Sequence, residues 1–187
     1  MVSHGETESL VKGPDLINES DPCRLAAIDI GTNSTHLLIA AIDTGLNAFT
    51  IELAEKSTTR LGERDTESGC LTDLAMNRVF ETLKRFKDFA LSYKVKSLVI
   101  AATSAVRDAP NGKDFLIQIK EQLDLDVDLI SGPEEARLIY LGVLSGMQFG
   151  EQPHYVLDIG GGSTELILAD SHDARALTST KIGAVRL

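Results

Sequence analysis

A short strand–turn–strand sequence occurs twice in this chain, and this repetition constrains the fold more than any other feature. Segments 29–41 and 158–170 align without a gap at an offset of 129 residues, and seven of the thirteen aligned positions are identical. An offset of this size is too long for a solenoid repeat. The duplication therefore predicts two halves of one fold, each presenting a strand, a glycine turn and a second strand to a shared cleft.

Both turns have the composition of a phosphate-binding site. Glycines allow the backbone to approach an anion closely, so several N–H groups can converge on it, and Ser and Thr hydroxyls add further donors. A glycine-rich hairpin is the plainer interpretation of a single copy, but two aligned copies favour phosphate. The candidate phosphate-binding residues are Gly31, Thr32, Asn33 and Ser34 in the first copy and Gly160, Gly161, Gly162, Ser163 and Thr164 in the second.

An aspartate precedes each turn, at the end of the first strand of the copy. Asp29 and Asp158 cannot bind phosphate directly, because like charges repel. Each can instead hold Mg²⁺ and its waters, and the metal then bridges to phosphate oxygens. The sequence therefore predicts Asp29 and Asp158 as metal-side carboxylates, with Asp158 the stronger candidate, and Mg²⁺ as the cofactor.

The composition limits the class of protein. The chain has 187 residues, of which 43% are hydrophobic, and a net charge of −10. This acidic balance argues against a general nucleic-acid binder, and no apolar run approaches the length of a membrane span. The amino terminus lacks the pattern of a secretory signal, and Cys23 and Cys70 form no metal-binding or disulfide framework. We therefore expect a cytoplasmic globular protein without nucleic-acid or membrane partners.

Hydrophobic periodicity predicts an α/β fold with the order βββαβαβα, a mixed sheet with helices on both faces. Strands are expected over 25–31, 35–42, 48–55, 97–102 and 127–130, and helices over 73–93, 114–123 and 131–147, with Thr72 capping the first helix. Short connections predict that the first three strands are antiparallel neighbours. The long helix before 97–102 predicts that this strand is central and parallel. Pro133 fixes the start of the third helix, because proline is tolerated only in a first helical turn. Residues 1–23 are predicted to be a disordered tail, 24–147 the first lobe, and 153–187 the start of an incomplete second lobe.

Four ordered motifs resemble those of the exopolyphosphatase and guanosine pentaphosphate phosphatase family, in the superfamily of actin, sugar kinases and heat-shock 70 ATPases. They are segments 29–34, 102–107, 131–138 and 158–165. The resemblance covers 25–187 and implies a ribonuclease H-like lobe of the actin-like ATPase type, with a second such lobe only begun. The family's second half continues past Leu187, so the chain is expected to be a fragment. Arg64-Asp65 stand where family members usually have a glycine, and the family's later phosphate-contacting lysine has no counterpart.

The resemblance also implies a mechanism, in which a carboxylate acts as general base on a water that attacks the terminal phosphorus. Glu134 and Glu135 are adjacent candidates, and both could instead simply complement the helix dipole. Ser131 and Glu134 have capping-box spacing, which gives Glu134 a structural role. The family motif places the catalytic glutamate at Glu135, which is therefore the predicted base.

Further roles follow from the same resemblance. Arg107 is expected to clamp a phosphate, and Glu165 is the family's other acid near the metal or the water. The position of Glu165 on a strand leaves open whether its side chain points inward or outward. His36, which aligns with Glu165, is expected to contribute packing, whereas Arg60 and Arg137 are expected to lie on the surface.

The resemblance implies a Mg²⁺-dependent exopolyphosphatase, a homodimer, that releases orthophosphate from the end of inorganic polyphosphate. A guanosine pentaphosphate phosphohydrolase would share all of these motifs and remains open. Two alternatives belong to other classes: a nucleotide-binding switch module related to ATPases or kinases, and a non-catalytic phosphate-binding module or inactive fragment. The motif at 131–138 and the arginine motif argue against the switch module.

Overall fold

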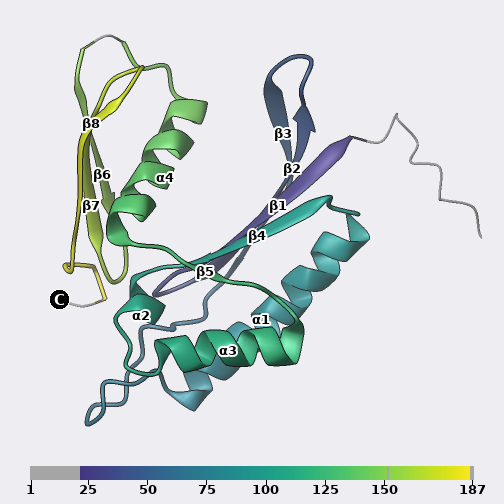
Figure 1. The fold of residues 1–187 in the computed structure, drawn as a ribbon, viewed down its shortest axis with the longest axis vertical. Coiled ribbons are helices and arrows are strands. Elements are labelled where there is room, and N and C mark those ends of the chain that lie inside the picture. The colour runs from purple at the N-terminus through teal and green to yellow at the C-terminus, as the bar shows by residue number, and fades with distance from the viewer. Residues whose placement is uncertain (1–21, 151, 186–187) are drawn as a thin grey trace, which may run out of the picture.

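The computed structural model of the chain describes residues 22–150 and 152–185 (Figure 1). The predicted disordered tail lies outside these residues, apart from its last two positions. The elements are β1 (Cys23–Ile30), β2 (Thr35–Asp43), β3 (Ala48–Ser57), α1 (Asp73–Ser92), β4 (Ser97–Ala102), α2 (Ser104–Arg107), α3 (Gly112–Leu123), β5 (Asp128–Leu129), α4 (Gly132–Gly146), β6 (His154–Ile159), β7 (Thr164–Ala169) and β8 (Ala174–Thr180).

The first sheet has five strands in the order β3-β2-β1-β4-β5. β1, β2 and β3 are antiparallel neighbours, and β4 and β5 run parallel to β1. This mixed α/β sheet confirms the predicted fold class and the central, parallel position of β4. Ile30 pairs with Ala102 in the β1–β4 register, so the first glycine turn and Thr103 leave the same edge of the sheet. Open α/β sheets bind ligands at this edge.

Helices α1 and α3 cover one face of the five-stranded sheet (Figure 1). Thr72 caps α1 by accepting the N–H of Ala75 at 3.2 Å, as its position before the apolar stripe predicts. Phe80 of α1 meets Phe115 of α3 edge to face, with ring centroids 5.5 Å apart. None of the helices described over 22–150 and 152–185 combines the length and the apolar character that a membrane crossing requires.

The placement of α4 differs from the expectation of helices on both faces of the first sheet. Ala136 and Tyr140 of α4 are buried against Ile167 and Ala169 of β7, so this helix packs on the second sheet (Figure 1). The opposite face of the first sheet keeps Val99 55% exposed. The sequence could not make this assignment, because α4 carries apolar residues on several sides and its periodicity does not say which sheet it meets.

The second sheet reproduces the opening of the first. Its strands are antiparallel in the order β6-β7-β8, and Asp158 pairs with Glu165 in the same register that pairs Asp29 with His36. β8 supplies the third strand of the repeated pattern. The duplicated sequence therefore forms a duplicated strand–turn–strand structure.

One face of this second sheet is apolar and uncovered. Alternate residues of β6 point away from α4, and Tyr155, Leu157 and Ile159 are 84%, 56% and 62% exposed. Leu166, the cross-strand partner of Leu157, extends the patch and is 42% exposed. Contiguous apolar surface of this kind favours association, and among the described residues β6 is also an edge strand, which adds to that tendency.

We predict that the 187-residue chain self-associates through this patch. Leu157→Lys should shift the sedimentation profile from oligomers towards monomer, because it places a charge at the centre of the apolar surface. Leu74→Lys is the matched control, since Leu74 is 66% exposed on α1, outside the patch. A chain that sediments as a monomer without any substitution would contradict the prediction.

Candidate active site

The two glycine turns meet at one polar cavity of about 250 Å³. Here the first turn means residues 31–34 and the second turn residues 160–163. The lining residues come from both turns, from the strands that flank each turn, from the two residues after β4 and from the start of α4: Asp29, Gly31, Thr32, Asn33, Ser34, His36, Thr103, Ser104, Glu135, Asp158, Gly160, Gly161, Gly162, Ser163 and Glu165. The shared cleft predicted from the duplication is therefore present.

The turns have the same internal geometry and lie close together. The N–H of Gly31 donates to the carbonyl of Ser34 at 3.1 Å, and the N–H of Gly160 donates to that of Ser163 at 3.0 Å. A Cβ at Gly162 would stand 2.6 Å from the hydroxyl oxygens of both Thr32 and Ser104. Real Cβ atoms do not approach other atoms so closely, so only glycine allows the second turn to reach the first.

Hydroxyl groups from β4 and the short helix α2 complete this wall of the cavity. Thr32 Oγ1 and Ser104 Oγ are hydrogen-bonded at 3.1 Å and are buried. Of segment 102–107, the sequence predicted only Arg107 as a site residue, and Thr103 and Ser104 were given no role. Their signal was present, since they follow directly after the carboxyl end of a predicted parallel strand.

Glu135 lies in the first turn of α4, half-buried between the two sheets. Its Oε2 accepts a hydrogen bond from Arg107 Nη1 at 3.2 Å, and the same nitrogen donates to the carbonyl of Ile130 at 2.8 Å. Burial raises the pKa of Glu135 to about 7, and the nearby charge of Glu165 adds to the rise, against the opposing effect of Arg107. A carboxyl group with this pKa can exchange a proton near neutral pH.

Glu134, by contrast, is engaged outside the cavity. Its backbone N–H donates to Ser131 Oγ at 3.3 Å, which is the N-cap bond that the capping spacing predicts. Its carboxylate accepts two hydrogen bonds from Arg137, both at 2.8 Å, and this contact lowers the pKa of Glu134. The geometry therefore separates two adjacent glutamates that the sequence could distinguish only by the capping argument and the family motif.

Glu165 points inward and is 1% exposed, so the strand orientation left open by the sequence is resolved. Its Oε1 accepts a hydrogen bond from Ser179 Oγ of β8 at 2.7 Å. A buried carboxylate needs such a donor, because an unpaired charge is costly to bury. Ser179 was missed from the sequence, and nothing in the local pattern of β8 distinguishes it from an ordinary strand serine.

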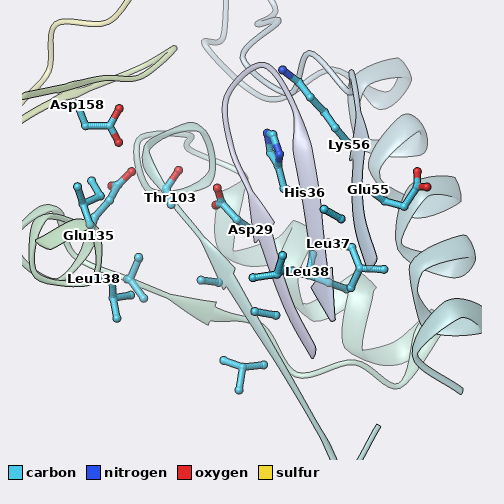
Figure 2. Close-up of a pocket in the computed structure, with 17 residues that line it drawn as sticks. Asp29, His36, Leu37, Leu38, Glu55, Lys56, Thr103, Glu135, Leu138 and Asp158 are labelled. Carbon is cyan, nitrogen blue, oxygen red and sulfur yellow. The ribbon is translucent and has the colours of Figure 1, made fainter. Parts of the chain in front are cut away.

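Asp29 and Asp158 face the cavity from opposite sheets, and Figure 2 shows them converging with Thr103 and Glu135. Burial raises the pKa of Asp29, and repulsion by Asp158 adds to the rise while His36 opposes it. Two carboxylates that repel one another beside phosphate turns fit a hard dication, which would neutralise both. Among residues 22–150 and 152–185 no group of three His, Cys, Asp or Glu side chains could hold a metal by protein ligands alone. Mg²⁺ commonly uses one or two carboxylates together with phosphates and waters.

The remaining predicted residues lie at or beyond the edge of the cavity. Arg107 contacts Glu135 and does not line the cavity. Thr164 does not line the cavity either, and its O–H group donates a hydrogen bond to the carbonyl of Ile182 at 2.6 Å. His36 is exposed at the cavity and its Nε2 lies 2.8 Å from Ser34 Oγ, so the expectation of a packing role was wrong. Arg60 is exposed, as expected of a surface residue.

Comparison with known proteins agrees with the fold and identifies the family. The Ppx/GppA phosphatase family matches residues 38–187. The chain belongs to this family, whose members are phosphatases that hydrolyse phosphoanhydride bonds. The chain is 38% identical over 160 residues to a guanosine-5'-triphosphate,3'-diphosphate pyrophosphatase of Photobacterium profundum, covering 86% of this chain and 32% of that protein. It is 32% identical over 164 residues to exopolyphosphatase 1 of Mycobacterium tuberculosis, covering 88% of this chain and 47% of that protein.

Solved structures give the same result. The chain superposes on an exopolyphosphatase from Cytophaga hutchinsonii with a TM-score of 0.82 and 34% identity, covering 87% of this chain and 52% of that one. For the PPX-GPPA enzyme of Aquifex aeolicus the TM-score is 0.77 and the identity is 35%. This match covers 87% of this chain and 54% of that one. The chain thus spans between about a third and a half of the length of the relatives it matches.

The contact between Ser179 and Glu165 predicts a measurable stability effect. Ser179→Ala should lower the free energy of unfolding by ~1.5–3 kcal/mol, the value of a hydrogen bond to a buried charged group. Thr180→Ala is the matched control on the same strand, since its hydroxyl donates to the neutral carbonyl of Thr164 at 3.1 Å. Urea unfolding of the two variants measures the difference, and equal losses would contradict the assignment.

Proposed function

We propose that this chain is part of a Mg²⁺-dependent exopolyphosphatase that releases orthophosphate from the end of inorganic polyphosphate. The observation that carries the proposal is Glu135, a half-buried carboxyl group with a pKa of about 7, held by Arg107 at the edge of a cavity lined by two glycine turns. Family membership and a relative named exopolyphosphatase support it. The proposal includes a homodimer as the working form.

In this proposal Glu135 accepts a proton from water as the water oxygen attacks the terminal phosphorus. The new P–O bond forms as the phosphoanhydride bond breaks, so orthophosphate and a chain shorter by one phosphate leave the site. Arg107 orients the Glu135 carboxylate, and the backbone N–H groups and hydroxyls of the turns bind the phosphate oxygens. Such positioning is the main requirement of phosphoryl transfer.

Asp29 and Asp158 are the residues that would hold Mg²⁺. When bound there, the ion would neutralise charge on the phosphate oxygens and on these two carboxylates. Ser179 donates a hydrogen bond to Glu165 and holds it near Glu135. Together with burial, the negative charge of Glu165 raises the pKa of Glu135 and so makes Glu135 a stronger base.

A guanosine pentaphosphate phosphatase is the second candidate, and one observation favours it. An open apolar hollow of about 640 Å³ adjoins the polar cavity and shares Asp29, Glu135 and Asp158 with it. Leu38, Val99 and Leu138 are among the residues that line the hollow, and Figure 2 shows Leu138 beside Glu135 on α4. Apolar surface next to a phosphate site suits a nucleoside, which polyphosphate lacks.

Phosphate release from polyphosphate, guanosine pentaphosphate and ATP, measured side by side, tests the proposal. We expect the full-length protein to act on polyphosphate fastest and on ATP slowest, and the 187-residue chain to have negligible activity. Preference for guanosine pentaphosphate would select the second candidate. Preference for ATP would support a nucleotide-binding switch module, and no phosphate release by the full-length protein from any of the three substrates would refute a catalytic role.

Glu135→Gln in the full-length protein should reduce kcat on polyphosphate by about 10²–10⁴-fold, the usual contribution of a general base. Glu134→Gln, the matched control at the neighbouring position, should have a much smaller effect. The activity of the unsubstituted full-length protein should rise as the pH increases through about 7, because Glu135 must lose its proton before it can accept one from water. A larger loss for Glu134→Gln with intact folding would reverse the assignment.

Asp158→Asn should raise the Mg²⁺ concentration needed for half-maximal activity, because a neutral amide is a poor ligand for a hard dication. Asp173→Asn is a suitable control, as Asp173 is exposed and does not line the cavity. Titration of activity with Mg²⁺ measures the shift. An unchanged Mg²⁺ requirement would remove Asp158 from the metal site.

A further inference from the structure

Each glycine turn is held from behind by a segment that sequence reasoning did not connect with it. The first backing segment is residues 59–62, which precede α1, and the second is residues 183–185, which follow β8. In the first, the N–H groups of Thr59 and Arg60 donate to the carbonyl of Asn33 at 3.1 and 2.9 Å. The N–H of Gly62 donates to the carbonyl of Thr32 at 2.8 Å.

The second backing segment makes the corresponding bonds to the second turn. The N–H of Ala184 donates to the carbonyl of Gly160 at 2.9 Å, and that of Val185 to the carbonyl of Gly161 at 2.9 Å. Thr32 and Gly161 occupy equivalent positions in the sequence repeat. The carbonyl of this position is therefore bound from behind in both turns, by two segments with different sequences.

Both backing segments contain a glycine that packs directly on its turn. A Cβ at Gly62 would stand 2.5 Å from Thr32 Cγ2, and a Cβ at Gly183 would stand 2.5 Å from the carbonyl oxygen of Gly161. The first segment also holds Arg60 in the left-handed region, at φ 48°. That conformation is unfavourable for a residue with a side chain, and it persists here in the residue whose N–H reaches Asn33.

These bonds fix the direction of the peptide groups in the turns. In a trans peptide the C=O and the following N–H point in opposite directions, and the described residues contain no cis peptide bond. A carbonyl bound from behind therefore directs the next N–H away from the backing segment, towards the cavity that the turns line. The N–H groups so directed include those of Asn33, Ser34 and Gly161.

We propose that residues 59–62 and 183–185 are positioning elements that orient the N–H groups of Asn33, Ser34 and Gly161 towards phosphate oxygens. The inference rests on the proposed function, because it assigns the donors that hold the substrate. It adds two segments outside the duplicated sequence to the machinery of the site. It also predicts that a Cβ at Gly62 would collide with the Thr32 side chain and that a Cβ at Gly183 would collide with the backbone of the second turn.

Binding of inorganic pyrophosphate with Mg²⁺, measured by calorimetry on the 187-residue chain, tests the inference without requiring turnover. Gly62→Ala should weaken binding by about tenfold or more, the loss expected when a hydrogen bond to a charged group is misaligned. Adding Thr32→Ser should restore most of the affinity, because serine lacks the obstructing methyl group and keeps the hydroxyl. Gly142→Ala is the control, since a Cβ there would meet no atom within 4 Å.

Gly183→Ala should cause a larger loss, because its Cβ would meet the backbone of Gly161 and Gly162 and no side chain could yield. Amide NMR spectra of the unsubstituted chain provide a test that does not depend on the variants folding. Pyrophosphate should shift the signals of Asn33, Ser34 and Gly161 more than those of the backing segments.

The outcomes separate the two proposals. Pyrophosphate binding that survives Gly62→Ala, or NMR shifts confined to other residues, would overturn the positioning inference and leave the proposed function standing. No pyrophosphate binding by the unsubstituted chain would overturn the phosphate role of the turns, and with it both proposals.

Discussion

The close approach of the two glycine turns is the constraint on which the rest of the site depends. A Cβ at Gly162 would have no room, because it would stand 2.6 Å from the hydroxyl oxygens of both Thr32 and Ser104, and a Cβ at Gly161 would already be 3.0 Å from Thr32 Cβ. Because the turns meet, the strand ends that precede them bring Asp29 and Asp158 to one cavity. A larger residue at position 162 would push the second turn away from Thr32 and Ser104 and so disturb the cavity.

This arrangement places several carboxyl groups together at a cost in stability. Burial and mutual repulsion raise the pKa values of Asp29 and Glu135, so at neutral pH the folded chain holds charge where water would stabilise it better. Perturbed acids of this kind gather at functional sites. Arg107 and Ser179 each offset part of the cost by donating a hydrogen bond to one carboxylate. A bound dication would offset a further part of this cost.

Much of the fold could be predicted from periodicity and local chemistry. Thr72, Ser131 and Pro133 set helix starts where their side chains predict them. The antiparallel β1–β2–β3 arrangement followed from short connections, and the parallel position of β4 followed from the helix before it. The helix α2 escaped prediction, because four residues are too few to show a period. The sheet that α4 covers also escaped, since its packing on Ile167 and Ala169 is a long-range contact.

The sequence by itself determined the duplicated turns and the aspartates before them, because these features are local and repeat at a fixed offset. It also showed the four motifs that resemble those of the family, because each motif is a short continuous segment. It also separated Glu135 from Glu134, through the capping spacing of Ser131 and the family motif. Only the tertiary structure decided that Glu165 points inward to Ser179, that Arg107 contacts Glu135, and that residues 59–62 and 183–185 support the turns. Those contacts join segments far apart in the chain, and their geometry depends on how the two sheets pack, which no local pattern records.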